Sequence, residues 1–335
     1  MTCEISREAF ARPGTQAGPI FWPTALYLLL VIAVCLGVRH SSLQQSLGQN
    51  LPYACFSFAL LLAPLWFLGF GVTKWIRNLA TFRWLRILPL ATLALPYLAF
   101  SLSAGQFRWT FALAMLALPT GLAILLEFSD LTPKLQWQDV VVLATLAATH
   151  MLKLFQGAWP YPGLASLPKL FLIDMALYLY LIVRNLDGVG YWLVPSLHTF
   201  AIGLREWLYF SPFGVGLGAV LHFTHFHASL PAPQRLAAAI VLTFALVAIP
   251  EELFFRGILQ NLLETRLGRR WALLLASLLF GLAHFNKGAI FNWRYVLLAT
   301  VAGIFYGRAW RAQRHLLAAI ITHTGVDVVW SLWFR

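Results

Sequence analysis

The chain has 335 residues, of which 60% are hydrophobic and only 11% are charged. Soluble domains carry about 25% charged residues, so this composition excludes an ordinary soluble domain and indicates a protein of the lipid bilayer. The net charge of +12 does not indicate a nucleic-acid partner, because the basic residues gather in short segments between apolar runs. These segments hold Lys74, Arg77, Arg83 and Arg86, then Arg266, Arg269 and Arg270, and finally Arg308, Arg311 and Arg314.

Apolar runs that approach the length needed to cross ~30 Å of hydrocarbon recur along the chain. We expect membrane-spanning helices at 21–38, 53–73, 85–102, 109–126, 138–155, 169–184, 236–263, 271–285, 289–307 and 315–334. The segment 186–235 is rich in glycine, proline and aromatic residues, and we expect a bent span with an interfacial piece there. The sequence therefore predicts an all-α polytopic membrane protein with about eleven transmembrane helices, within a range of roughly nine to twelve.

The basic segments also predict which helix ends share one side of the membrane, since cytoplasmic loops are enriched in lysine and arginine. If 74–86 is cytoplasmic, the amino terminus is cytoplasmic as well, and Arg184 returns to that side after the sixth expected span. Segments 264–271 and 308–315 belong on the same side. This arrangement requires one net crossing within 186–235.

Three charged residues interrupt the apolar stretch "AIPEELFFRGIL" at 248–259. A charge at the centre of a membrane helix costs about 2.5–3.5 kcal/mol, so such residues mark functional sites. Residues four apart share a helix face, which places Arg256 next to Glu252. Glu251 is rotated by ~100° from Glu252 and stays unmatched. Pro250 frees a backbone carbonyl and can open the helix to water, so the surplus Glu251 is the first indication of chemistry.

Two later spans add further polar groups. The stretch "FGLAHFNKG" holds His284, and "HTGVD" places His323 and Asp327 four residues apart on one face. A single histidine within a membrane is usually a hydrogen-bonded core residue. Two histidines, an aspartate and a surplus glutamate in the last 90 residues together supply a base, oxyanion partners and an orienting group. Asp139 and Asp174 also lie at or within spans and fit no such pattern.

These three stretches carry a resemblance to a known family. They resemble the EExxxR, FxxxH and HxxxN/D motifs of the CAAX-protease and bacteriocin-processing membrane proteases, which include the type II CAAX prenyl endopeptidases. The matching residues are Glu251, Glu252 and Arg256, then Phe280 and His284, then His323 and Asp327. The resemblance covers about 205–335 and implies a conical helical core that holds a catalytic site. We therefore expect a catalytic membrane core at 206–335 and a set of amino-terminal helices of unknown role at 1–205.

The resemblance implies a role for each matching residue. Glu251 would be the base that activates a water for attack on a peptide carbonyl, and His284 would help to hold that water. His323 and Asp327 would face the developing oxyanion, while Glu252 and Arg256 would form a structural pair that fixes Glu251. The prenyl endopeptidases carry asparagine where this chain has Asp327. An ionised aspartate would repel an oxyanion, so Asp327 is either protonated or orients His323 instead.

The resemblance implies an intramembrane endopeptidase that cuts a membrane-associated or lipidated protein or peptide, in a bacterial inner membrane. We expect no cofactor, because the sequence lacks the HExxH pattern of many zinc proteases. A zinc-dependent endopeptidase remains an alternative, with Glu251, His284 and His323 as the ligands. A second alternative is a non-catalytic immunity or scaffold protein on the same fold. A transporter is disfavoured, because the chain has no two related halves with paired broken helices.

Overall fold

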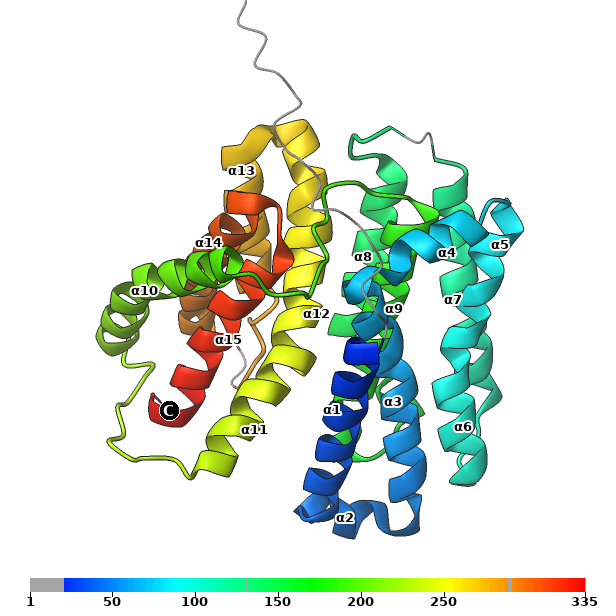
Figure 1. Cartoon of the computed structure of the whole chain (residues 1–335), viewed down its shortest axis with the longest axis horizontal. Coiled ribbons are helices and arrows are strands. Elements are labelled where there is room, and N and C mark those ends of the chain that lie inside the picture. Colours follow the sequence, from blue (N-terminus) through cyan, green and yellow to red (C-terminus); the bar gives the residue numbers. More distant parts are fainter. Residues whose placement is uncertain (1–20, 130–131, 289–290, 335) are drawn as a thin grey trace, which may run out of the picture.

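The computed structural model describes residues 21–129, 132–288 and 291–334, and within these ranges the chain is almost entirely helical (Figure 1). No strand occurs in this part of the chain, and the one β-bridge there joins Phe226 to Phe334. The predicted all-α class is therefore correct. Cys3, Glu4, Glu8 and Asp130 lie outside the described residues.

The amino-terminal helices form one side of the molecule, drawn from blue to green in Figure 1. Their order is α1 (Phe21–Arg39), α2 (Ser42–Leu47), η1 (Gly48–Asn50), α3 (Leu51–Phe67), η2 (Leu68–Val72), α4 (Thr73–Leu79), α5 (Arg83–Ile87), η3 (Leu88–Ala94), α6 (Leu95–Ser103), α7 (Trp109–Glu127), α8 (Trp137–Met151), η4 (Gln156–Ala158), η5 (Pro162–Leu164), α9 (Ser166–Tyr178) and η6 (Leu179–Val183). Helix α9 is buried along nearly its whole length, which makes it the centre of this side.

The carboxy-terminal helices form the other side of the molecule. Their order is α10 (Leu197–Val220), α11 (Pro233–Thr243), η7 (Phe244–Ala248), α12 (Ile249–Glu252), η8 (Leu253–Gln260), α13 (Asn261–Leu282), α14 (Trp293–Gln313) and α15 (Leu316–Trp333). Helix α10 lies across α14 and α15 (Figure 1). It approaches α15 closely at Gly203, whose carbonyl accepts a hydrogen bond from the Thr322 hydroxyl at 2.9 Å.

An extended segment at 185–196 joins the two sides. Its backbone is tied to the amino-terminal side where the Leu193 amide donates to the Gly69 carbonyl at 2.8 Å. It is tied to the carboxy-terminal side where the Leu316 amide donates to the Gly190 carbonyl at 2.9 Å. Gly190 has a positive φ of 70° and lies directly against the Arg314 backbone, so any larger side chain would clash there.

Seven helical runs in the described residues are long and apolar enough to cross a membrane, so this is an integral membrane protein. The expected count of about eleven is not confirmed. One run, Pro233–Leu282, covers two expected spans because the chain turns at Gly268, where φ is 73°. The expected spans at 138–155 and 289–307 correspond to α8 and α14, which fall outside the seven.

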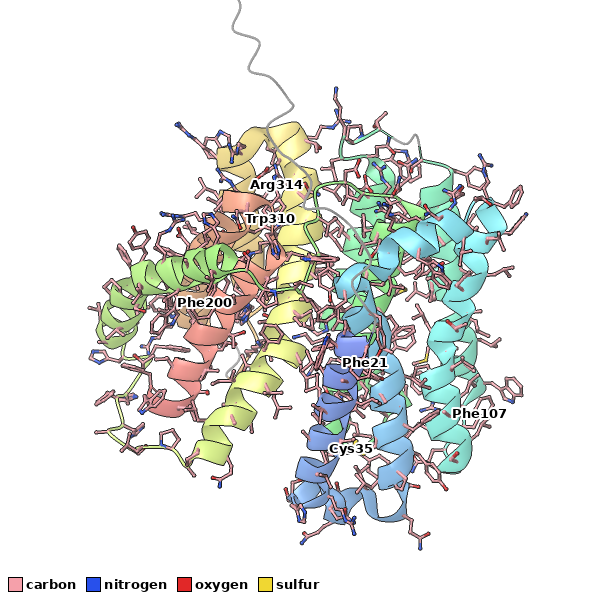
Figure 2. The ribbon with its side chains drawn as sticks, in the orientation of Figure 1. Phe21, Cys35, Phe107, Phe200, Trp310 and Arg314 are labelled. Carbon is pink, nitrogen blue, oxygen red and sulfur yellow. The ribbon has the colours of Figure 1, made fainter. Side chains whose placement is uncertain are left out.

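The basic segments meet at one end of the molecule. Three arginine side chains bond to carbonyls of neighbouring segments there: Arg77 to Leu181, Arg184 to Thr132, and Arg266 to Leu135. These bonds link α4, η6, α13 and the connection before α8. Arg314 lies at this upper end and Cys35 near the lower end (Figure 2). The connection between α10 and α11 lies near the lower end (Figure 1). The expected net crossing within 186–235 stays a prediction.

Asp139, which the sequence left unexplained, has a structural role at the start of α8. Its carboxylate accepts the Gln136 amide at 2.9 Å in a capping box and pairs with the Arg184 side chain at 3.1 Å. The expected division between residues 205 and 206 lies inside α10, which is continuous from Leu197 to Val220. The assignment of separate roles to the two parts stays a prediction.

Candidate active site

The EExxxR stretch begins on α12, a single α-helical turn between two wider π turns, η7 and η8. Pro250 has no amide hydrogen, and its ring crowds the carbonyl of residue 246, which lies in η7. The wider turn relieves this crowding and exposes backbone groups, as π segments often do at functional sites. The proline therefore accounts for the irregular backbone that presents Glu251 and Glu252.

Glu252, Arg256 and His323 form a buried network. Arg256 donates to Oε1 of Glu252 at 3.1 Å, and Nδ1 of His323 lies 2.7 Å from the same oxygen. The side chains of all three are at most 3% exposed. Arg256 also donates to the carbonyl of Gly303 at 3.2 Å, which ties the network to α14. The predicted Glu252–Arg256 pair is present, and its hydrogen bonds hold His323.

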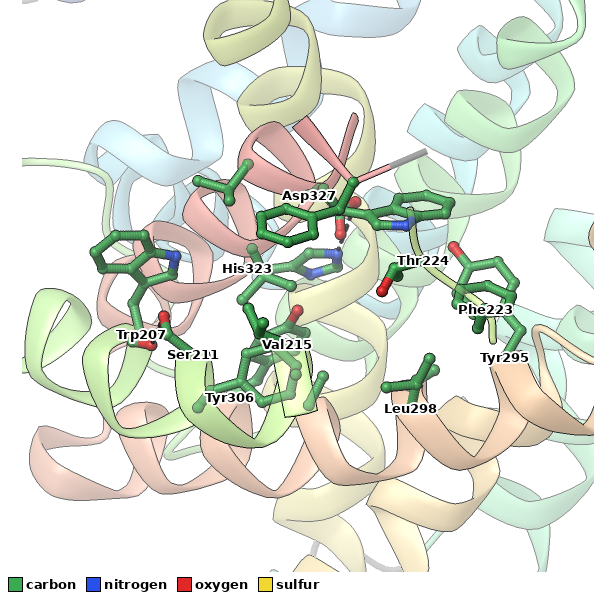
Figure 3. Close-up of a pocket in the computed structure, with 18 of the residues that line it drawn as sticks. Trp207, Ser211, Val215, Phe223, Thr224, Tyr295, Leu298, Tyr306, His323 and Asp327 are labelled. Atoms are coloured by element: carbon green, nitrogen blue, oxygen red, sulfur yellow. Dashed lines mark hydrogen bonds and ion pairs between the residues drawn. The ribbon is translucent and has the colours of Figure 1, made fainter. Parts of the chain in front are cut away.

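His323 is fixed on three sides. Its ring stacks on Tyr306 with centroids 4.6 Å apart and an interplanar angle of 14°. Its Nε2 lies 3.4 Å from Oδ2 of Asp327, one helical turn further on. Figure 3 shows His323 between Asp327 and Tyr306. Because Nδ1 is taken by Glu252, Nε2 is the ring atom that can face a reacting group.

Glu251 points away from this network, as its rotation from Glu252 requires. Its Oε1 accepts a hydrogen bond from Lys169 of α9 at 2.7 Å. Its Oε2 lies 3.9 Å from Nε2 of His323 and has no hydrogen-bond partner among the described residues. Glu251 is thus held by a cation from the amino-terminal side, whereas the expected structural pair, Glu252 and Arg256, contacts His323.

His284 lies at the end of α13, next to the same network. Its Nδ1 is 2.8 Å from the Phe280 carbonyl, the local bond that four-residue spacing on a helix allows. The ring of Phe280 contacts both imidazoles, with centroids 4.8 Å from His284 and 5.8 Å from His323. The Arg256 guanidinium lies 4.3 Å over the same phenyl ring. Phe280 therefore contacts residues of all three motifs. The sequence identified it as a motif residue but assigned it no role.

A cavity of about 330 Å³ opens beside these residues (Figure 3). His284, His323 and Asp327 are the polar groups of one wall, and most of the remaining wall is aromatic or aliphatic. Helix α10 closes one side with Trp207, Phe210, Ser211, Gly214 and Val215. Such a lining suits an apolar chain with a few polar contacts at one end.

The zinc alternative requires Glu251, His284 and His323 to converge on one point. Among the described residues, no three histidine, cysteine, aspartate or glutamate side chains lie close enough together to hold a metal ion. The residues therefore do not fit a resident zinc ion in this arrangement.

Residues 233–329 match the family model described as type II CAAX prenyl endopeptidase Rce1-like. This region belongs to the CAAX-protease and bacteriocin-processing family. All three motifs of this protease family lie within the match, which confirms the resemblance predicted from them. No curated protein and no solved structure matches the chain.

Two parts of the site lie outside the CAAX-protease match, namely Lys169 and the cavity wall contributed by α10. Lys169 was not among the residues predicted from the sequence, although it is a charged residue at the start of an expected span. The same cost argument applies to lysine. An isolated lysine in "SLPKLFLID", at the start of an expected span, was the signal that could have identified it.

Proposed function

We propose that this protein is an intramembrane endopeptidase that cuts a membrane-associated or lipidated protein with a water activated by Glu251. The observation that carries the proposal is the pairing of Oε2 of Glu251 with Nε2 of His323 at 3.9 Å. This distance is too long for a direct hydrogen bond and is one that a water molecule can bridge. Both atoms belong to family motifs, and they come from different helices.

In the proposed reaction the water oxygen attacks the carbonyl carbon of the scissile peptide bond while Glu251 accepts a proton from it. The tetrahedral oxyanion forms on the side of His323, and His284 holds the water or the carbonyl in place. Collapse of the intermediate breaks the C–N bond, and the proton held by Glu251 passes to the leaving amine. Glu252 and Arg256 keep Nδ1 of His323 engaged, so that Nε2 faces the substrate.

Asp327 is proposed to orient His323. Its carboxylate lies 3.4 Å from Nε2 of His323 and its side chain is 31% exposed, toward the cavity. A carboxylate in this place holds the imidazole ring in one direction beside the cavity, so that the ring can contact the substrate carbonyl. In this role Asp327 need not contact the oxyanion, so an aspartate can replace the asparagine of the prenyl endopeptidases at this position.

The aromatic cavity supports a substrate with an apolar or lipidated segment that lies beside the scissile bond. We further propose a bacterial inner membrane as the location, with the amino terminus and the basic end of the bundle in the cytoplasm.

The test compares membranes from cells that carry the wild-type protein, Glu251→Gln or His284→Ala, and identifies protein termini by mass spectrometry. We expect a set of new termini with the wild type that disappears with both variants. Asp187→Asn, which removes an exposed carboxylate outside the proposed site, serves as the control and should retain them. Termini that persist with Glu251→Gln would show that Glu251 is not the base. A cellular phenotype that survives both variants would support the non-catalytic immunity or scaffold alternative.

A further inference from the structure

A second cavity, of about 220 Å³, lies at the basic end of the carboxy-terminal side, between α10, α13 and α14. Its lining consists of Arg205, Glu206, Arg269, Arg308, Arg311 and Ala312. We call this the arginine pocket. It shares no lining residue with the cavity beside His323, and the proposed peptidase chemistry uses none of its residues.

The carboxylate at the base of the arginine pocket is already engaged. Glu206 is 1% exposed; its Oε1 accepts a hydrogen bond from Arg205 at 2.8 Å, and its Oε2 forms an ion pair with Nε of Arg308 at 3.0 Å. The pair with Arg308 links α10 to α14, and the two pairs together fix both guanidinium groups, whose side chains are about half exposed. Glu206 thus positions cations that still have free donors, because a guanidinium offers five N–H groups.

The other side of the pocket has cations in excess. Arg311 lies 3.6 Å from Glu264, which also pairs with Arg314. The Nε atom of Arg311 is buried and has no hydrogen-bond partner among the described residues. Burial lowers the pKa of Arg311; Glu264 opposes this, while repulsion from Arg269, Arg314 and Arg308 adds to it. Four arginines and one carboxylate line the pocket, so a bound anion would relieve repulsion that the protein itself leaves unbalanced.

Exposed apolar side chains lie near the pocket residues along α10 and α13. Leu204 and Leu208, on the same helix as Arg205, are 40% and 54% exposed, and Trp271, two residues after Arg269, is 69% exposed. An exposed tryptophan beside arginines is typical of the headgroup level of a bilayer. The pocket lies at the end where the basic segments meet, so its cations and its apolar rim match the headgroup and the acyl chains of one lipid.

We propose that the arginine pocket binds the phosphate of an anionic phospholipid headgroup, with the acyl chains against Leu204 and Leu208. Arginine suits this ligand because its planar fork donates two parallel hydrogen bonds to phosphate oxygens. Basic pockets between membrane helices on the cytoplasmic side bind such headgroups. The exposed apolar rim favours a lipid over a free phosphate ion, which would gain nothing from it.

The pocket is adjacent to the proposed catalytic cavity. Helix α10 directs Arg205 and Glu206 to the arginine pocket, and the next residue, Trp207, lines the other cavity. A headgroup that bridges Arg205 to Arg269 and Arg311 would hold α10 against α13 and α14 (Figure 1). Lipid binding near the middle of α10 would therefore steady the wall of the catalytic cavity.

The test uses the purified full-length protein in neutral detergent. Native mass spectrometry and thermal unfolding are measured with dioleoyl phosphatidylglycerol, with dioleoyl phosphatidylcholine and with inorganic phosphate. The pocket variants are Arg269→Gln on α13 and, from a different helix, Arg205→Gln, whose side chain is 49% exposed. Arg270→Gln is the matched control, because it removes the same charge from the next residue, which does not line the pocket.

We expect phosphatidylglycerol to bind and to raise the unfolding temperature of the wild type and Arg270→Gln, and phosphatidylcholine to do neither. Each pocket variant should weaken phosphatidylglycerol binding by about tenfold, as for the loss of one charge-assisted hydrogen bond. Equal binding by Arg269→Gln, Arg205→Gln and Arg270→Gln would overturn the proposal. An equal response to inorganic phosphate would also overturn it in favour of a soluble anion. A variant that fails to fold is identified by its lack of a thermal unfolding transition in the presence of phosphatidylcholine. In that case phosphatidylglycerol binding by the other pocket variant tests the proposal.

Discussion

The ammonium group of Lys169 lies 2.7 Å from Oε1 of Glu251 and joins the most buried helix of the amino-terminal side to the family motif. The Glu251 side chain is 11% exposed and that of Lys169 is 24% exposed, so both charges are largely withdrawn from water. A charge in this setting requires a partner. The amino-terminal helices therefore contribute a residue to the proposed site, although the family match begins only at residue 233.

Replacement of Lys169 by methionine should destabilise the protein by about 1–3 kcal/mol, because it leaves the Glu251 carboxylate without its cation. The lysine is partly exposed, so the cost should be lower than for a fully buried pair. The double variant Lys169→Met/Glu251→Gln removes both charges and should recover part of the loss. Thermal unfolding in detergent measures both. Lys134→Met, at an exposed position, is the control and should change little. Strictly additive effects of the two substitutions would show that the ion pair is energetically unimportant.

The pairing of Glu252 with Arg256 could be predicted from sequence because it depends only on helical spacing. Contacts between distant segments could not be predicted in this way. Glu206 received no role at all, yet it is buried and its partner Arg308 is supplied by the crossing of α10 over α14. The helical state of α10 was also uncertain, because Pro212, Gly214, Gly216 and Gly218 all disfavour a helix locally. Packing against α14 and α15 overrides that preference.

Substitution of Arg256 by lysine should cost about 1–3 kcal/mol even though the charge is kept. The guanidinium donates hydrogen bonds to Glu252 and to the Gly303 carbonyl, and it also lies over the ring of Phe280. A lysine ammonium cannot make all three contacts at once. The same substitution at Arg266, whose Nε donates to the Leu135 carbonyl in an exposed setting, is the control. Unfolding temperatures of the two variants decide the matter. Equal losses would contradict a special role for the planar group.

Gly303 allows α13 and α14 to approach closely beside Arg256. A Cβ at this position would lie 3.1 Å from Cα of Ser277 and 3.2 Å from Nη2 of Arg256. Gly303 and Gly307 form a GxxxG pair, a pattern that lets membrane helices pack backbone to backbone. We expect Gly303→Ala to destabilise by about 1–3 kcal/mol and to lower proteolysis, because backbone and Arg256 must both shift. Gly121→Ala on α7, where a Cβ meets nothing within 4 Å, should be neutral or slightly stabilising.

Chelation tests the glutamate mechanism against the zinc alternative. His323 has Nδ1 bound to Glu252, and the described residues contain no group of three ligands around Glu251, His284 and His323. We therefore expect proteolysis to survive treatment with a zinc chelator and metal content to be substoichiometric in active protein. Activity that is lost on chelation and returns with added zinc would show that the site rearranges to bind metal, and the proposed mechanism would then be wrong.

The orientation of the bundle can be tested with single cysteines introduced at opposite ends. Ser229 lies in the connection between α10 and α11, and Arg270 lies in the basic segment after Gly268. In a variant without Cys3, Cys35 and Cys55, a membrane-impermeant maleimide added to intact cells should label Ser229→Cys and leave Arg270→Cys unmodified. Permeabilised cells should give labelling of both, which controls for reactivity. Because an odd number of crossings separates the two positions in the proposed arrangement, labelling of both in intact cells would contradict it.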